Sequence, residues 1–272
     1  MYTKKAICDQ LACMGAPRDR VVLMHSSLRL IGEVEGGGEG LLDALIEYFT
    51  AEGGLLCVPT HTWGNVGKDC PTLDMTVPDN SLGAFSRIAA ADGRGIRSEN
   101  PTHSMVVFGD RAQAEAFVAD DARITSPTAS DSCYGKIYEQ DGYILLAGVS
   151  QNRNTYLHGV AEMLALPNRM KGTIPVSVRR KTGEVVCREL AWYDQETYGD
   201  VSLRFPKYEI AFRYYGGVRD GFLGDAPCQL CSAKIMKDTV ALIFSRSEGK
   251  DPLRNEGPIP PRWYCRGSGE IV

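Results

Sequence analysis

Short apolar runs alternate with segments of helical periodicity in the first half of the chain. Residues 21–24 and 55–59 are continuous apolar runs, typical of buried strands. Between them, apolar residues recur every three or four positions from Leu41 to Phe49, which predicts a helix. This strand, helix, strand order favours a parallel pair of strands. Ligands gather at the carboxyl ends of such strands, which here carry residues 25–27 and 60–62.

The remaining apolar pattern predicts further strands and helices around the same sheet. Residues 105–108 and 142–149 read as buried strands, and the polar segment 150–155 can cap a helix that begins near Tyr156. A Lys-Thr-Gly turn at 181–183 lies between two strand-like segments and predicts a hairpin, hence an antiparallel component. We therefore expect an α/β fold with a mixed, partly parallel central sheet and flanking helices. Other predicted helices cover residues 4–15, 84–91, 111–118 and 233–244, and residues 228–231 are strand-like.

Length and composition indicate an ordinary folded protein. With 272 residues, 43% of them hydrophobic, we expect one domain over 1–272 with a possible minor subregion from about 195. A net charge of −4, without dense Lys or Arg clusters, argues against nucleic acid as a partner. Asp9 falls where a signal peptide would need uninterrupted apolar residues, and no later apolar stretch is long enough to span a bilayer. Nine cysteines scattered along the chain fit thiols that are kept reduced. These features predict a cytoplasmic protein without a membrane partner.

Four histidines limit the candidates for imidazole chemistry. His158 falls in the first turn of the helix predicted near Tyr156, where backbone dipoles favour a neutral ring that can accept a proton. Glu162 lies four residues further, on the same helix face, and could orient that ring. From spacing alone, a capping or core histidine at 158 with a solvated Glu162 is a better interpretation than a proton acceptor oriented by Glu162. Ser26 and Ser27 could likewise hold phosphate or pantetheine groups, or cap a turn.

Five segments in a fixed order carry a family resemblance. They are residues 21–29, 59–62, 97–101, 141–149 and 154–158, the last being Asn-Thr-Tyr-Leu-His. Over roughly residues 1–200 the chain resembles the aminoglycoside 3-N-acetyltransferase family. This family has the antibiotic N-acetyltransferase-like fold, which is distinct from that of the GCN5-related acetyltransferases.

The resemblance implies acetyl transfer from acetyl-CoA to a primary amine, the 3-amino group of an aminoglycoside. His158 would be the general base, with Glu162 beside it. It further implies contacts to coenzyme A from Ser26, Ser27, Leu28, Arg29, Arg97, Ser104 and Thr155, and contacts to the amine substrate from His61, Trp63, Asp69 and Asp194. Because a thioester is already an activated acyl donor, direct transfer needs neither a metal ion nor a covalent intermediate.

The chain departs from the family pattern on the substrate side. Asn100 stands where the family usually has His, and Ala161 stands where it has an acid, so Asp194 rivals Glu162 as the acid that orients His158. Asn65 replaces an acidic residue of the loop after Pro59. An acetyltransferase for a different amine, or a noncatalytic CoA-binding relative, therefore remain alternatives. The oligomeric state is not predicted.

A single CxxC raises the question of a structural metal. Cys228 and Cys231 supply two thiols, and a closed zinc site needs about four ligands, for which Cys187 or Cys265 would be candidates. Two packed thiols are the favoured interpretation, and zinc is the minority hypothesis. The glycines at 36–38 lack the Lys-Ser/Thr ending of a P-loop and are expected to form a turn.

Overall fold

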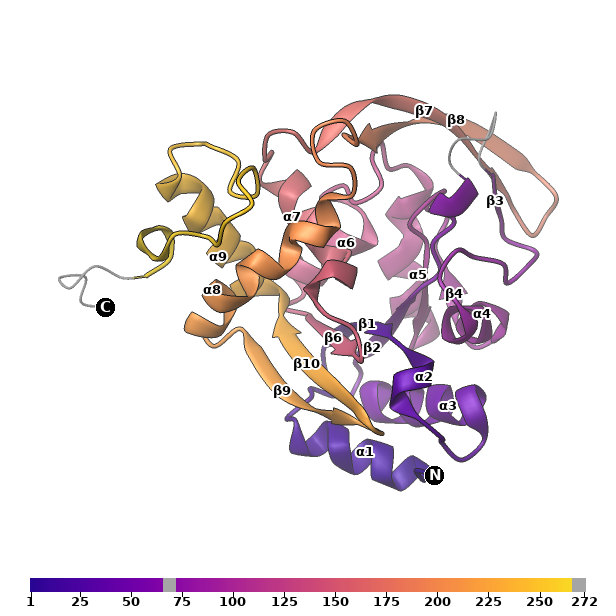
Figure 1. Cartoon of the computed structure of the whole chain (residues 1–272). Coiled ribbons are helices and arrows are strands. Elements are labelled where there is room, and N and C mark those ends of the chain that lie inside the picture. Colours follow the sequence, from indigo (N-terminus) through magenta and orange to yellow (C-terminus); the bar gives the residue numbers. More distant parts are fainter. Residues whose placement is uncertain (66–71, 266–272) are drawn as a thin grey trace.

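The chain folds around a seven-stranded sheet (Figure 1). The structure is a computed structural model that describes residues 1–65 and 72–265. The central strand β1 pairs in parallel with β2 and with β6, and the outer strands pair antiparallel. The prediction of a mixed, partly parallel sheet is confirmed. From edge to edge the strands are β4 (Ile96–Arg97), β5 (Met105–Phe108), β2 (Leu55–Pro59), β1 (Val21–Ser26), β6 (Tyr143–Ala147), β10 (Ala226–Ser232) and β9 (Val218–Leu223).

Helices cover both faces of this sheet, which explains why its central strands are apolar at successive positions. Side chains of a strand alternate between faces, so Val22 and Met24 enter one core while Val21 and Leu23 enter the other. We call the first the α3 core; its helices are α1 (Lys4–Cys13), α3 (Gly37–Thr50) and α4 (Ala84–Ala91). We call the second the α7 core; its helices are α5 (Arg111–Val118), α6 (Cys133–Glu139), α7 (Tyr156–Met163), η4 (Val201–Tyr208), α8 (Glu209–Tyr214) and α9 (Ala233–Arg246).

Local capping explains where several helices begin. The Thr3 hydroxyl accepts a hydrogen bond from the Ala6 amide at the start of α1, and the Ser232 hydroxyl accepts one from the Ile235 amide at the start of α9. Gly36 caps α3 with a φ of 74°, a conformation that suits glycine. The glycines at 37 and 38, which we expected in a turn, already belong to this helix. Shorter elements are α2 (Leu28–Ile31), η1 (Trp63–Asn65), η2 (Ala119–Ala122), η3 (Gln151–Arg153) and η5 (Pro261–Trp263).

The predicted hairpin is present, but it lies outside the central sheet. β7 (Met170–Arg179) and β8 (Val185–Tyr193) pair antiparallel, and β7 also pairs in parallel with β3 (Thr72–Asp74). These strands form a separate three-stranded sheet at the side of the molecule opposite α1 (Figure 1). The central sheet is mixed for a different reason from the one we expected, because its antiparallel strands are β4, β5, β9 and β10.

The C-terminal part contributes to the main sheet. Beyond Trp192 we expected one strand-like segment, residues 228–231, and a helix over 233–244, and β9 was not anticipated. Its residues Arg219, Asp220 and Phe222 are exposed, so the segment lacks the apolar run of a buried strand. β9 and β10 pair as a hairpin that extends the central sheet beside β6. Within residues 1–65 and 72–265, no helix combines the length and apolar character needed to cross a membrane.

The CxxC thiols occupy different cores. Cys228 and Cys231 are three positions apart on β10, so they point to opposite faces of the sheet. Cys228 packs in the α3 core and Cys231 in the α7 core. This pair therefore does not supply two ligands to one zinc ion, and its thiols are packing residues.

Candidate active site

Three histidines meet on one face at the carboxyl ends of the central strands. His25 follows Val21 and Leu23 on β1 and shares their orientation toward the α7 core. Beyond β2 the antiparallel pairing with the chain before β5 continues, because the Thr60 and Thr62 amides donate to the Ser104 and Thr102 carbonyls. This register places His61 opposite His103, and their ring centroids are 4.7 Å apart. The strand-end argument thus located His25 and His61, but not the partner His103.

His158 reaches the same side of the sheet from the first turn of α7, where the sequence predicted it. Its ring lies against Tyr193, with centroids 4.6 Å apart, and against Phe205 at 4.9 Å. Tyr193 also contacts the His103 ring, with centroids 5.5 Å apart. A continuous row of rings, which we call the ring wall, thus runs through His61, His103, Tyr193, His158 and Phe205. No sequence signal marked Tyr193 or Phe205, because both come from distant elements.

Burial keeps these imidazoles neutral. It lowers the pKa of His158 to about 4, with the Asp200 carboxylate opposing this shift and the Arg169 cation reinforcing it. Burial also lowers the pKa of His25 and of His103 to about 3. The pKa of His61 is likewise lowered by burial and by the neighbouring histidines. Near neutral pH each ring therefore has one unprotonated nitrogen.

The depressed pKa values make folding stability depend on pH. In the unfolded chain a histidine takes up a proton below about pH 6.5, whereas the buried His25 and His103 and the partly buried His158 resist protonation until about pH 3–4. Stability is therefore complete above about pH 6.5 and falls as pH decreases, by up to about 1.4 kcal/mol per pH unit for each histidine. Denaturant unfolding at a series of pH values between about 7 and 5 measures this slope. The slope reports how many more protons the unfolded chain binds than the folded protein, and His103→Asn should lower that number by about one. An unchanged slope would contradict the burial of this ring.

The two acids proposed to orient His158 make other contacts. The partly buried Glu162 carboxylate accepts hydrogen bonds from the Ser126 hydroxyl, the Thr128 hydroxyl and, at 3.1 Å, the Thr128 amide. The Asp194 carboxylate accepts from the Thr197 hydroxyl at 2.7 Å and caps the turn after β8. Among the described residues neither acid has a hydrogen bond or ion pair with His158. Asp200, which the sequence analysis did not single out, is the carboxylate whose charge acts on this ring.

The predicted coenzyme A residues fall into two groups. Ser26, Ser27 and Leu28 are partly exposed where β1 passes into α2, Arg29 is exposed, and Thr155 is partly exposed directly before α7. These five are accessible to a ligand.

Arg97 and Ser104 form the second group, because their polar atoms are already bonded within the protein. The Arg97 guanidinium donates to the carbonyls of Thr60, Val77 and Asp79 at 2.9–3.2 Å, and so holds the segment 77–79 against the end of β2. The buried Ser104 hydroxyl donates to the Thr60 carbonyl at 2.8 Å. Both residues stabilise the loop that carries His61.

The predicted substrate residues differ in accessibility. Trp63 is 42% exposed, whereas His61 is buried and its Nε2 lies 2.8 Å from the Tyr134 hydroxyl. That hydroxyl donates to the His103 carbonyl, so His61 Nε2 is the donor in the first bond and its Nδ1 keeps the lone pair. Asp69 lies outside the described residues. Asn100 fills a folding role, since its amide donates to the Pro127 carbonyl and its oxygen accepts from the His103 amide.

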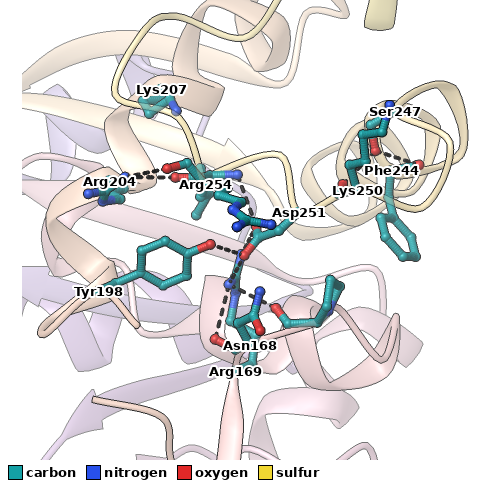
Figure 2. A network of polar contacts seen from close by, with 12 residues as sticks. Asn168, Arg169, Tyr198, Arg204, Lys207, Phe244, Ser247, Lys250, Asp251 and Arg254 are labelled. Atoms are coloured by element: carbon teal, nitrogen blue, oxygen red, sulfur yellow. Dashed lines mark hydrogen bonds and ion pairs between the residues drawn. The ribbon is translucent and has the colours of Figure 1, made fainter. Parts of the chain in front are cut away.

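A buried ion pair supports the site from the C-terminal side. Figure 2 shows the Arg169 guanidinium and the Tyr198 hydroxyl pointing at the same Asp251 carboxylate. The two Arg169 bonds are 2.6 and 2.7 Å long, and both side chains are almost fully buried. Arg204 adds bonds to the carbonyls of Leu253 and Arg254. This network ties the start of β7 and the helix η4, which carries Phe205, to the segment after α9.

The site offers acid–base and hydrogen-bonding groups rather than metal ligands. Across the part of the chain that the structure describes, no three His, Cys, Asp or Glu side chains come together in a way that could hold a metal ion. The arrangement presents the neutral imidazole of His158, packed against aromatic rings at the carboxyl ends of the central strands. Accessible hydroxyls lie at the same ends of these strands. Such a group can accept a proton from an attacking nucleophile.

Comparisons with known proteins agree with this architecture. An aminoglycoside N(3)-acetyltransferase IV from Salmonella sp. is 29% identical over 254 residues, covering 93% of this chain and 89% of the relative. The structure of AAC-IIIb in a binary complex with CoASH superposes with a TM-score of 0.77 at 21% identity, covering 92% of this chain and 98% of that one. A His-to-Ala variant of AAC(3)-IVa in complex with a gentamicin gives a TM-score of 0.76 at 24% identity, covering 97% and 94%.

The two structural likenesses show a shared fold, and the family follows from the sequence. The model of one family, aminoglycoside 3-N-acetyltransferase, matches residues 23–245, which is most of the chain and includes all four histidines. The chain therefore belongs to the aminoglycoside 3-N-acetyltransferase family.

Proposed function

We propose that this protein transfers an acetyl group from acetyl-CoA to a primary amine of an aminoglycoside, at its 3-amino group, with His158 as the general base. The observation that carries this proposal is the neutral imidazole of His158, held in the ring wall of a chain that belongs to this family. The Salmonella relative is named for the same reaction, and AAC-IIIb binds CoASH in the same fold. We place the reaction in the cytoplasm.

The proposed step is direct attack of the amine on the thioester. The nitrogen lone pair forms a bond to the acetyl carbonyl carbon, and the carbon–sulfur bond then breaks to release coenzyme A as a thiolate. As the nitrogen gains positive charge it becomes strongly acidic, so the His158 lone pair can take its proton although the ring is a weak base. The proton afterwards neutralises the thiolate or passes to solvent.

The proposed cofactor contacts follow from accessibility. Ser26, Ser27, Leu28 and Arg29 lie at the carboxyl end of β1, where ligands of such sheets bind, and Thr155 precedes the helix that carries His158. Exposed Arg29 offers a cation for a phosphate group. Arg97 and Ser104 would support this site through the end of β2, since their bonds are internal.

On the substrate side, exposed Trp63 offers a flat apolar surface to a sugar ring. Asp194 and Asp69 stay proposals for carboxylates that attract ammonium groups. The rings that contact His158, those of Tyr193 and Phe205, are uncharged, and Asp200 is the carboxylate whose charge acts on this imidazole. The rival proposal is an acetyltransferase whose acceptor is a less charged amine.

Thiol release from acetyl-CoA, measured with a panel of acceptors, tests the proposal. We expect turnover with gentamicin and other aminoglycosides that carry a free 3-amino group, and none when that group is blocked. Mass spectrometry should find a single added acetyl group. Turnover with simple amines alone would support the rival acceptor, and CoA binding without turnover on any amine would indicate a noncatalytic relative.

A further inference from the structure

The imidazole of His158 is held by rings rather than by an acid. Among the described residues its ring nitrogens have no hydrogen bond or ion pair with another side chain. Tyr193 contacts the ring at a tilt of 38° and Phe205 at 70°, so one ring lies partly over the imidazole while the other meets it edge-on. Aromatic contacts of this kind contribute about 0.5–1.5 kcal/mol each and have a preferred geometry. The orientation of the imidazole therefore depends on how firmly Tyr193 is itself held.

The hydroxyl of Tyr193 is held by Thr128. The two hydroxyl oxygens are 3.1 Å apart, and the single hydroxyl proton of Thr128 is already donated to the Glu162 carboxylate. Tyr193 must therefore be the donor in its bond to Thr128. Burial, together with the charge of Glu162, raises the pKa of the Tyr193 phenol, so the proton stays on this oxygen.

Glu162 connects Thr128 and Tyr193 to the helix that carries His158. It lies one turn beyond His158 on α7 and, besides Thr128, receives the Ser126 hydroxyl. A chain of contacts thus starts on α7 at Glu162, passes through the Thr128 and Tyr193 hydroxyls, and returns to α7 at the His158 ring. Hydrogen bonds in such a chain polarise and strengthen one another.

We propose that Tyr193 is the positioning residue of His158 and that Thr128 and Glu162 act on the imidazole through the Tyr193 hydroxyl. This inference rests on the proposed role of His158 as base. It gives Glu162 a place in the site without a direct bond to the imidazole. It also explains why the hairpin of β7 and β8 belongs to the site, since Tyr193 is the last residue of β8. A proton acceptor must be held to within about 0.5 Å of its productive position. The contacts from Glu162 through Thr128 to Tyr193 fix one face of the His158 imidazole.

The decisive experiment is a double-mutant cycle between Tyr193→Phe and Thr128→Val. Each variant removes one hydroxyl and keeps the size of the side chain. We expect Tyr193→Phe to lower kcat about 5- to 20-fold, with the KM for acetyl-CoA changed less than about twofold, because the base is misplaced while the cofactor contacts remain. If Thr128 acts through Tyr193, Thr128→Val should cost little further kcat in the Tyr193→Phe background.

Two further variants separate positioning from general stability. Tyr156→Phe is the matched control, because the buried Tyr156 hydroxyl donates to the Ala233 carbonyl at 2.9 Å from the same helix but reaches toward α9. Its kcat should stay within about twofold of the wild type although it loses one hydrogen bond. Thr128→Ser keeps the hydroxyl and should restore most of the kcat that Thr128→Val loses.

A pH profile separates the role of the Tyr193 ring from that of its hydroxyl. Tyr193→Leu uncovers the imidazole, so the pKa of His158 should rise from about 4 toward its ordinary value, and the acidic limb of kcat/KM should move up by about one unit or more. Tyr193→Phe keeps the ring and should leave that limb in place.

The outcomes distinguish this inference from the proposed function. Equal kcat in wild type, Tyr193→Phe and Thr128→Val, or multiplicative losses in the double variant, would overturn the positioning role. If His158→Ala is inactive at the same time, the base assignment still stands. Activity that survives in His158→Ala would show that His158 is not the base and would overturn that part of the proposed function.

Discussion

Replacing His158 by alanine is expected to lower kcat by about 10²- to 10⁴-fold, the range typical for loss of a general base. The nitrogen that attacks the thioester would then have to lose its proton to water. Steady-state thiol release at saturating acetyl-CoA measures the loss. Calorimetric titration with coenzyme A should show unchanged affinity, because the accessible residues at the end of β1 are not altered.

The pH dependence supplies the check on this variant. In both enzymes kcat/KM should fall with decreasing pH as the amine substrate gains a proton. In the wild type it should fall further as pH decreases through about 4, where His158 becomes protonated in the free enzyme and cannot accept a proton. The residual activity of His158→Ala should lack this second limb. Near-normal turnover of the variant across this pH range would show that another group is the base.

Asp251→Ala is expected to lower the free energy of unfolding by about 3–5 kcal/mol, the cost of leaving a buried charge without its partner. Figure 2 shows why the loss is large: the Arg169 guanidinium makes two bonds to this carboxylate, and the Tyr198 hydroxyl makes another. Chemical denaturation of both proteins at neutral pH gives the difference.

An exposed ion pair provides the control for this measurement. Asp9 pairs with Lys5 on the surface of α1, so Asp9→Ala should cost less than about 1 kcal/mol. Replacing both buried partners, with Arg169→Met and Asp251→Leu together, should recover much of the stability lost in Asp251→Ala. A cost for Asp251→Ala no larger than that for Asp9→Ala would mean that water reaches the pair.

The sequence predicted the elements with a regular pattern of buried residues, which are the fully buried strands and the helices with one buried face. The apolar runs of β1, β2 and β6 and the periodic helices α3 and α9 are clear because both faces of the central sheet are covered. β9 escaped prediction because it lies at an edge of the sheet and is largely exposed. The role of the β7–β8 hairpin was misassigned because a turn signal shows that two strands pair, but not which sheet they join.

The site was predictable where local sequence or the family resemblance pointed to it. His158 came from a helix start and a matching motif, and His25 and His61 came from strand ends. Tyr193, Thr128 and Phe205 approach His158 only through tertiary packing, so no local pattern marks them. Arg97 and Ser104 illustrate the converse, because a motif match does not reveal whether a polar side chain is already used in internal bonds.

The pairing of β1 with β6 has a consequence for how the protein folds. Val22 lies beside Tyr143, so the two central strands are joined across more than a hundred intervening residues. Parallel pairs of such long range form slowly, since the entropy of closing the chain is lost before the contacts are gained. The elements that carry His25 and His158 meet only when this pair has formed. We therefore expect the refolding enzyme to regain helical structure well before it regains acetyl transfer.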